Sequence, residues 1–123
     1  MRMVILSIRD RLDRFGVLLS GACALHCILS IVIVSGLGLG GEALLAPAIH
    51  EIGLAMAIVV GIATLGYGAI RHGAPRPLMI GGCGIALMTG ALGVGHGLPE
   101  AMLTIGGVAL VAWAHLLNLR RAH

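Results

Sequence analysis

Four long stretches without Asp, Glu, Lys or Arg limit what this chain can fold into. They cover residues 15–41, 52–70, 77–99 and 101–119, and charged residues make up only 11% of the chain. A soluble domain would carry about 25% charged residues, whereas a membrane-spanning helix needs about 20 predominantly apolar residues in a row. We therefore predict an all-α fold, an integral membrane four-helix bundle that forms a single domain over residues 1–123.

Prolines and charges set the expected limits of the helices. All four prolines fall at expected helix boundaries, where proline is tolerated best. They are Pro47, Pro75, Pro77 and Pro99. The predicted transmembrane helices cover about 15–37, 46–70, 77–96 and 99–119. Apolar residues at helical spacing alternate with charges in the first 14 residues, which predicts an N-terminal amphipathic interfacial helix over 1–14.

The basic residues are all arginines, and their positions indicate a topology. They lie before the first predicted span, between the second and third spans, and at the C-terminus. These arginines are Arg2, Arg9, Arg11, Arg14, Arg71, Arg76, Arg120 and Arg121. Cytoplasmic segments next to membrane spans are enriched in Lys and Arg, so we expect a multi-pass bacterial inner-membrane protein with both termini cytoplasmic. The net charge of +3 then reflects topology and does not indicate a nucleic-acid partner.

Cys23, His26 and Cys27 lie together on one side of the first predicted span. Ionisable groups inside a membrane are costly and usually mark a functional site. Thiolate and imidazole are suitable ligands for Hg(II), Cu(I) and Zn(II). We therefore predict a metal-binding group near the middle of the membrane.

A second set of possible ligands falls at the outer ends of the predicted helices. It consists of His50, Glu51, His96 and Glu100. Carboxylate and imidazole ligands suit Zn(II) better than Cu(I). His72 and His115 lie toward the inner side, where interfacial roles are the alternative to ligation. The order of these groups predicts a route for a metal cation from outside to inside.

Other features of the chain add packing rather than chemistry. Gly53, Ala57 and Gly61 recur at the spacing that lets membrane helices approach closely, and such faces could also support a homo-oligomer. Cys83, alone on the third span, is interpreted as a packing residue. The chain contains no phosphate-binding loop in a strand–loop–helix context and no hydrolytic triad pattern, so we do not expect an enzyme.

The chain resembles the MerC family of small inner-membrane mercury-resistance proteins. The residues that carry the resemblance are Ser20-Gly21-Ala22-Cys23-Ala24-Leu25-His26-Cys27, His50-Glu51, Arg71-His72, Glu100 to Gly107 and Ala114-His115-Leu116-Leu117-Asn118. It implies four membrane helices and uptake of Hg(II) into the cytoplasm through Cys23 and Cys27. The family's second cysteine pair near the C-terminus has no counterpart in the ending Arg120-Arg121-Ala122-His123. The additional His and Glu residues make Zn(II) a plausible substrate beside Hg(II).

Two other functions fit the same residues. One is a haem-binding or redox module in which His26 and a facing histidine ligate the iron; the scarcity of aromatic residues weighs against it. The other is a metal chaperone or sensor that binds the ion without transporting it. The sequence leaves these alternatives open.

Overall fold

All regular structure in the described part of the chain is helical. The computed structural model describes residues 2–33, 47–73, 75–94 and 98–122. The elements are α1 (Arg2–Ile31), α2 (Pro47–Gly61), a π-helix η2 (Ile62–Gly66), α3 (Tyr67–His72), α4 (Arg76–Gly93) and α5 (Leu98–Ala122). Because α2, η2 and α3 follow one another without a break, the chain forms four helical rods. The all-α prediction with four helices is confirmed.

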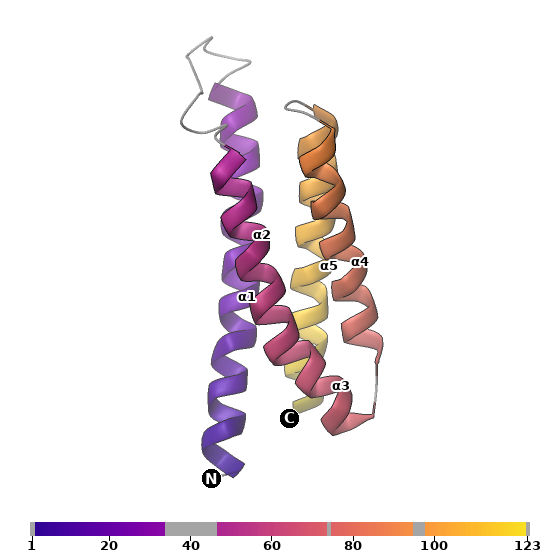
Figure 1. The fold of residues 1–123 in the computed structure, drawn as a ribbon. Helices are drawn as coiled ribbons and strands as arrows, with labels where there is room; N and C mark the ends of the chain where they lie inside the picture. The colour runs from indigo at the N-terminus through magenta and orange to yellow at the C-terminus, as the bar shows by residue number, and fades with distance from the viewer. Residues whose placement is uncertain (1, 34–46, 74, 95–97, 123) are drawn as a thin grey trace.

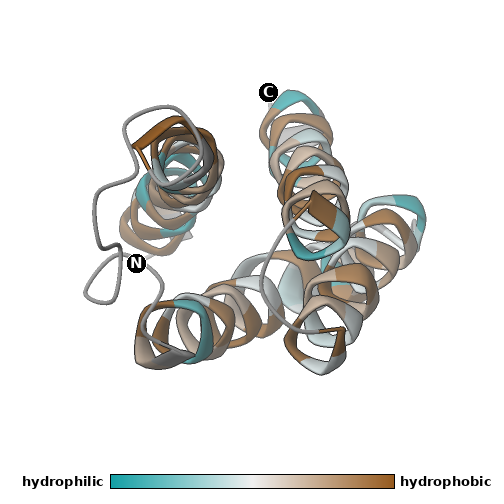
Figure 2. Ribbon diagram, turned by 90° about the horizontal axis from the view of Figure 1, so that it is seen from above, coloured by the Kyte–Doolittle hydropathy of each residue, from teal (hydrophilic) through white to brown (hydrophobic). Residues whose placement is uncertain are grey.

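The four rods surround a common interior, as Figure 2 shows from above. α5 packs against both α4 and α1, and the rod of α2, η2 and α3 contacts α1 and α4. The start of α1, the end of α5 and the connection from α3 to α4 all lie at one end of the molecule (Figure 1). Successive helices therefore run in opposite directions, as short connections require.

Three helices are long and apolar enough to cross a membrane. These stretches are Met3–Ser30, Ala48–Arg71 and Leu98–Arg120. α4 is not among them; its 18 residues would measure about 27 Å at 1.5 Å per residue, close to the thickness of the bilayer core. The chain is thus a multi-pass membrane protein, and the membrane position of α4 stays a prediction.

The first helix differs from the expectation. No break separates the segment predicted as an interfacial helix from the first predicted span, because α1 runs unbroken from Arg2 to Ile31. Buried residues follow each other every three or four positions along one face, through Arg9, Asp13, Gly16 and Ser20. This face stays in contact with α5, so the helix continues instead of turning onto the membrane surface. The predicted end at 37 lies outside the described residues.

The second rod contains a π-helical segment in its middle. In η2 the flanking Gly61 and Gly66 keep helical backbone angles, so the rod continues through the segment. The buried Thr64 hydroxyl donates a hydrogen bond of 2.8 Å to the carbonyl of Val60. Short π segments inside α-helices occur frequently at functional sites, and this one faces α5 and α1.

Small residues bring α4 and α5 into close backbone contact. A Cβ on Gly84 would lie 2.5 Å from the carbonyl oxygen of Gly107, and a Cβ on Gly107 would lie 2.6 Å from that of Gly84. Met88 and Val111 belong to the adjoining hydrophobic core. Glycine therefore determines the distance between these two helices, as is common in membrane bundles. Gly90, further along α4, is exposed.

Replacing Gly84 with Ala should destabilise the bundle. The new methyl group would lie 2.5 Å from the Gly107 oxygen and 2.8 Å from Cγ2 of Val111, and overpacking of this kind costs about 1–3 kcal/mol. Gly82→Ala is the matched control, because no atom lies within 4 Å of its Cβ position. Thermal unfolding in one detergent should show a lower melting temperature for Gly84→Ala only. Equal melting temperatures would contradict the close contact.

Candidate metal site

Three helix ends meet at the end of the molecule away from the termini. Cys27 lies one turn before the end of α1, His50 in the first turn of α2, and Glu100 in the first turn of α5. Cys27 and Glu100 are buried, and His50 is largely covered. Because these helices alternate in direction, residues far apart in the sequence reach the same level of the bundle.

His26, Cys27 and His50 form the close group at this level. One ligand atom from each lies within 4.8 Å of the others. The Cys27 Sγ is 3.8 Å from Nε2 of His50, and the rings of His26 and His50 are in edge contact with centroids 5.3 Å apart. Tetrahedral Zn(II), with bonds of about 2.3 Å to sulfur and 2.0 Å to nitrogen, places its ligand atoms about 3.5 Å apart. Small side-chain rotations would therefore bring the three atoms onto one ion, with a fourth position left open.

Glu100 adds a carboxylate to this group and lies where it can orient the ring of His50. Its Oε1 lies 3.4 Å from Nδ1 of His50, the nitrogen on the far side of the ring from Cys27. A carboxylate in this place orients a ligating imidazole and raises its basicity. One thiolate at Cys27 and one carboxylate at Glu100 would balance the two charges of a divalent cation.

The structure joins two groups that the sequence analysis separated. From the sequence, His26 and Cys27 are expected near mid-membrane, and His50 and Glu100 at the outer ends of their helices; in the structure they form one group. The reason is that the first turns of α2 and α5 lie beside Cys27: Nε2 of His50 is 3.8 Å from the Cys27 Sγ, and Oε1 of Glu100 is 3.4 Å from Nδ1 of His50. The two predicted sets of ligands are therefore joined.

The other predicted ligands lie apart from the close group. Cys23, one turn before Cys27, is half-buried and faces α2, where a Cβ on Gly53 would lie 3.5 Å from its Sγ. Glu51 is exposed, and His96 lies outside the described residues. Cys23 nevertheless shares a pocket of about 430 Å³ with His26 and His50, so a bound ion would have a further thiol within that pocket.

A second polar cluster, which the sequence analysis did not predict, joins α1, the π segment and α5. The carboxylate of Asp13 lies 2.7 Å from Nδ1 of His115 and accepts a 2.8 Å hydrogen bond from the Asn118 amide. The same amide reaches the carbonyl of Thr64 in η2 at 3.2 Å. All four side chains are almost fully buried. Helical spacing was the one feature of the sequence that could have indicated this cluster, because Asp13 falls one helical turn before Gly16 and two turns before Ser20, on the same face of the helix.

The arrangement of the histidines does not favour the haem alternative. The His26 and His50 rings touch edge to face at a centroid distance of 5.3 Å and an interplanar angle of 63°. Axial ligation would require a porphyrin plane between the two rings, and the rings leave no such gap. Among the histidines whose side chains the structure describes, His26, His50 and His115, no other pair is in ring contact.

Fold and site together define a small multi-pass helical membrane protein with a thiol–imidazole group able to hold a metal ion. The family model of the MerC mercury resistance protein matches residues 13–120. The chain therefore belongs to the MerC family, and the match includes both polar clusters. Comparisons with curated proteins and with solved structures gave no match.

Glu100→Gln should weaken metal binding, because it removes the charge behind His50 while keeping the side-chain shape. Losing a partner of a ligating histidine typically costs about 10–100-fold in metal affinity. Glu51→Gln is the matched control, since Glu51 directly follows His50 in α2 but is exposed. Titration of purified protein with Zn(II) in detergent measures both. A similar loss in the two variants would show that Glu100 has no specific role.

Proposed function

We propose that the protein carries a soft or borderline divalent cation, Hg(II) or Zn(II), inward across the membrane. The observation that supports this most directly is the close group of His26, Cys27 and His50, with the carboxylate of Glu100 behind His50. Such a group would replace water around the ion with thiolate and imidazole, the ligands these metals prefer. Membership of the MerC family makes Hg(II) the first candidate.

The choice between the two ions depends on how many thiols take part. Cys23 and Cys27 are four residues apart on one helix, so their Cβ atoms are about 5–6 Å apart. Two thiols at this distance can reach one Hg(II) ion by side-chain rotation. Zn(II) would instead be held by Cys27 together with the two imidazoles. The site thus supports both ions through overlapping ligand sets.

The arginines support an orientation of the protein in the membrane that fits inward transport. Arg9, Arg11 and Arg14 lie on the first half of α1, while Arg71, Arg76 and Arg120 lie at helix ends that Figure 1 places at the same end of the bundle as the two termini. The positive-inside rule assigns this end to the cytoplasm. The metal group at the opposite end would then open to the periplasmic side of a bacterial inner membrane, as an uptake protein requires.

Cys27→Ser and His50→Ala should each reduce metal entry into proteoliposomes at least about tenfold, because each removes a ligand whose loss strongly weakens such a site. Cys83→Ser is the matched control, since that thiol is exposed on α4 and should leave uptake unchanged. Uptake of Hg(II) and Zn(II) is measured by elemental analysis of the vesicles. If the variants bind less metal but the wild type shows no flux, the protein is a metal chaperone or sensor and not a carrier.

A reporter fused to the C-terminus, or inserted between α1 and α2, tests the orientation. Alkaline phosphatase folds only in the periplasm, where its disulfides form, so fusions after residue 123 should be inactive. A fusion in the segment between α1 and α2 should be active. The opposite pattern would reverse the proposed direction of transport.

A further inference from the structure

The cluster of Asp13, His115 and Asn118 lies in the half of the bundle nearer the termini. Asp13 and His115 are each fully buried, and Asn118 is 1% exposed. Burying a carboxylate and an imidazole inside a membrane protein is costly even when they are paired, and such residues commonly mark an ion pathway. This cluster therefore calls for a role in addition to packing.

One ring nitrogen of His115 is paired with Asp13, and the other has no hydrogen-bond partner among the described residues. Nδ1 lies 2.7 Å from the Asp13 carboxylate, so this nitrogen carries the proton that Asp13 accepts. In the neutral imidazole Nε2 then carries the lone pair. This atom has no hydrogen-bond partner within the described part of the chain although it is fully buried. Most buried polar atoms are hydrogen-bonded. A histidine whose second nitrogen is held by a carboxylate is the usual form of a metal ligand.

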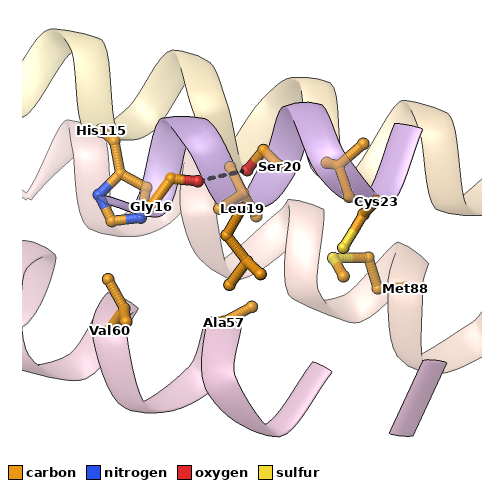
Figure 3. A pocket seen from close by; sticks show the side chains of 10 residues that line it. Gly16, Leu19, Ser20, Cys23, Ala57, Val60, Met88 and His115 are labelled. Atoms are coloured by element: carbon orange, nitrogen blue, oxygen red, sulfur yellow. Dashed lines mark hydrogen bonds between the residues drawn. The ribbon is translucent and has the colours of Figure 1, made fainter. Parts of the chain in front are cut away.

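The neighbourhood of His115 is a small cavity with His115 at one end and Cys23 at the other (Figure 3). Its free space of about 10 Å³ corresponds to about one water-sized particle. The Ser20 hydroxyl in its wall already donates to the carbonyl of Gly16. A buried water usually needs two to four polar partners, and this wall offers few.

The other side chains in the cavity wall that could ligate a metal ion are soft or borderline ligands. Besides His115, the cavity is lined by two sulfur-containing residues, Cys23 and Met88, and otherwise mainly by Leu, Val and Ala. Thiol, thioether and imidazole together favour soft or borderline cations over water or hard ions. The cavity thus offers the same kinds of ligand, a cysteine and a histidine, as the close group of His26, Cys27 and His50, which is called the outer group below.

Cys23 and Met88 also line the larger pocket that contains His26 and His50. The two residues therefore border both spaces, with the outer metal group on one side and His115 on the other. Along α1, Cys27 and Cys23 are separated by about 6 Å, and Cys23 and Gly16, which touches His115, by about 10 Å. These are short steps for an ion that moves between side chains.

We propose that His115, oriented by Asp13, is a second binding position for the transported cation, reached from the outer group past Cys23 and Met88. This inference rests on the proposed transport function and adds to it an inner position. The carboxylate of Asp13 offsets part of the charge of the ion. A position with one strong ligand binds briefly and releases readily, which conduction requires.

The test uses a variant that keeps the structure and removes the donor. In His115→Asn the amide nitrogen replaces Nδ1 and can still donate to Asp13, whereas nothing replaces Nε2. We expect Zn(II) and Hg(II) binding at the outer group to stay within about twofold of wild type, and flux into proteoliposomes to fall at least about tenfold. Flux equal to wild type would overturn the inner position, and so would an equal loss of binding and flux, which indicates a purely structural role.

Two further measurements hold even if that variant folds poorly. In the wild-type protein with ¹⁵N-labelled histidine, excess Zn(II) should shift the Nε2 resonance of His115 and leave Nδ1 nearly unchanged; an unshifted Nε2 overturns the proposal. Met88→Leu conserves volume but removes the thioether, and should slow Hg(II) flux several-fold relative to Met79→Leu, whose side chain is exposed on the same helix. Equal rates in these two variants would exclude Met88 from the path.

These results separate the inference from the proposed function. If Cys27→Ser transports as wild type does, the proposed function itself fails, whatever happens at His115. If Cys27→Ser loses flux while His115→Asn keeps it, only the inner position is excluded.

Discussion

The contact between Asp13 and His115 determines how the first and last helices align. The two residues are 102 positions apart in the sequence, yet their side chains are in direct contact at 2.7 Å, and the His115 ring packs on Gly16 one turn further along α1. Because α1 and α5 run in opposite directions (Figure 1), this contact fixes their relative position along the bundle axis. Moving fourteen residues up α1 reaches Cys27, and moving fifteen residues back along α5 reaches Glu100. Both distances are about 21–23 Å at 1.5 Å per residue, so the Asp13–His115 contact places Glu100 at the level of the group of His26, Cys27 and His50.

The second rod, formed by α2, η2 and α3, contributes to both the metal group and the cluster around Asp13. Its outer end supplies His50 to the metal group, and its middle supplies the Thr64 carbonyl to Asn118. The π segment lies at the second of these contacts, and beyond it the Asn118 side chain packs directly on Gly68. A larger side chain at Gly68 would occupy the place of the Asn118 amide. The irregular backbone and the glycine are thus explained by the same buried amide.

Much of the fold and part of the site could be predicted from the sequence. The uncharged stretches give the helices, and helical spacing correctly places Glu100, Thr104, Val111 and His115 on one buried face of α5. The contact between His50 and Cys27 could not be predicted, because it depends on how α1 and α2 are placed relative to each other along the bundle axis. The burial of Asp13 could not be predicted either, because it lies among arginines, in a charged stretch that is typical of a solvated surface. Only the partners on α5, more than 100 residues away, reveal that the carboxylate is buried and paired.

The contact between Cys27 and His50 has a consequence for the movement of the outer end. Without an ion, the close group there joins α1 to α2 through a sulfur–imidazole distance of 3.8 Å and an edge contact of two rings, both weaker than a metal–ligand bond. An ion bound by side chains of both helices would fasten them together, and its departure would release them. Under the proposed transport function, the bound ion itself would hold α1 and α2 together at this end of the bundle on arrival and would let them separate on leaving.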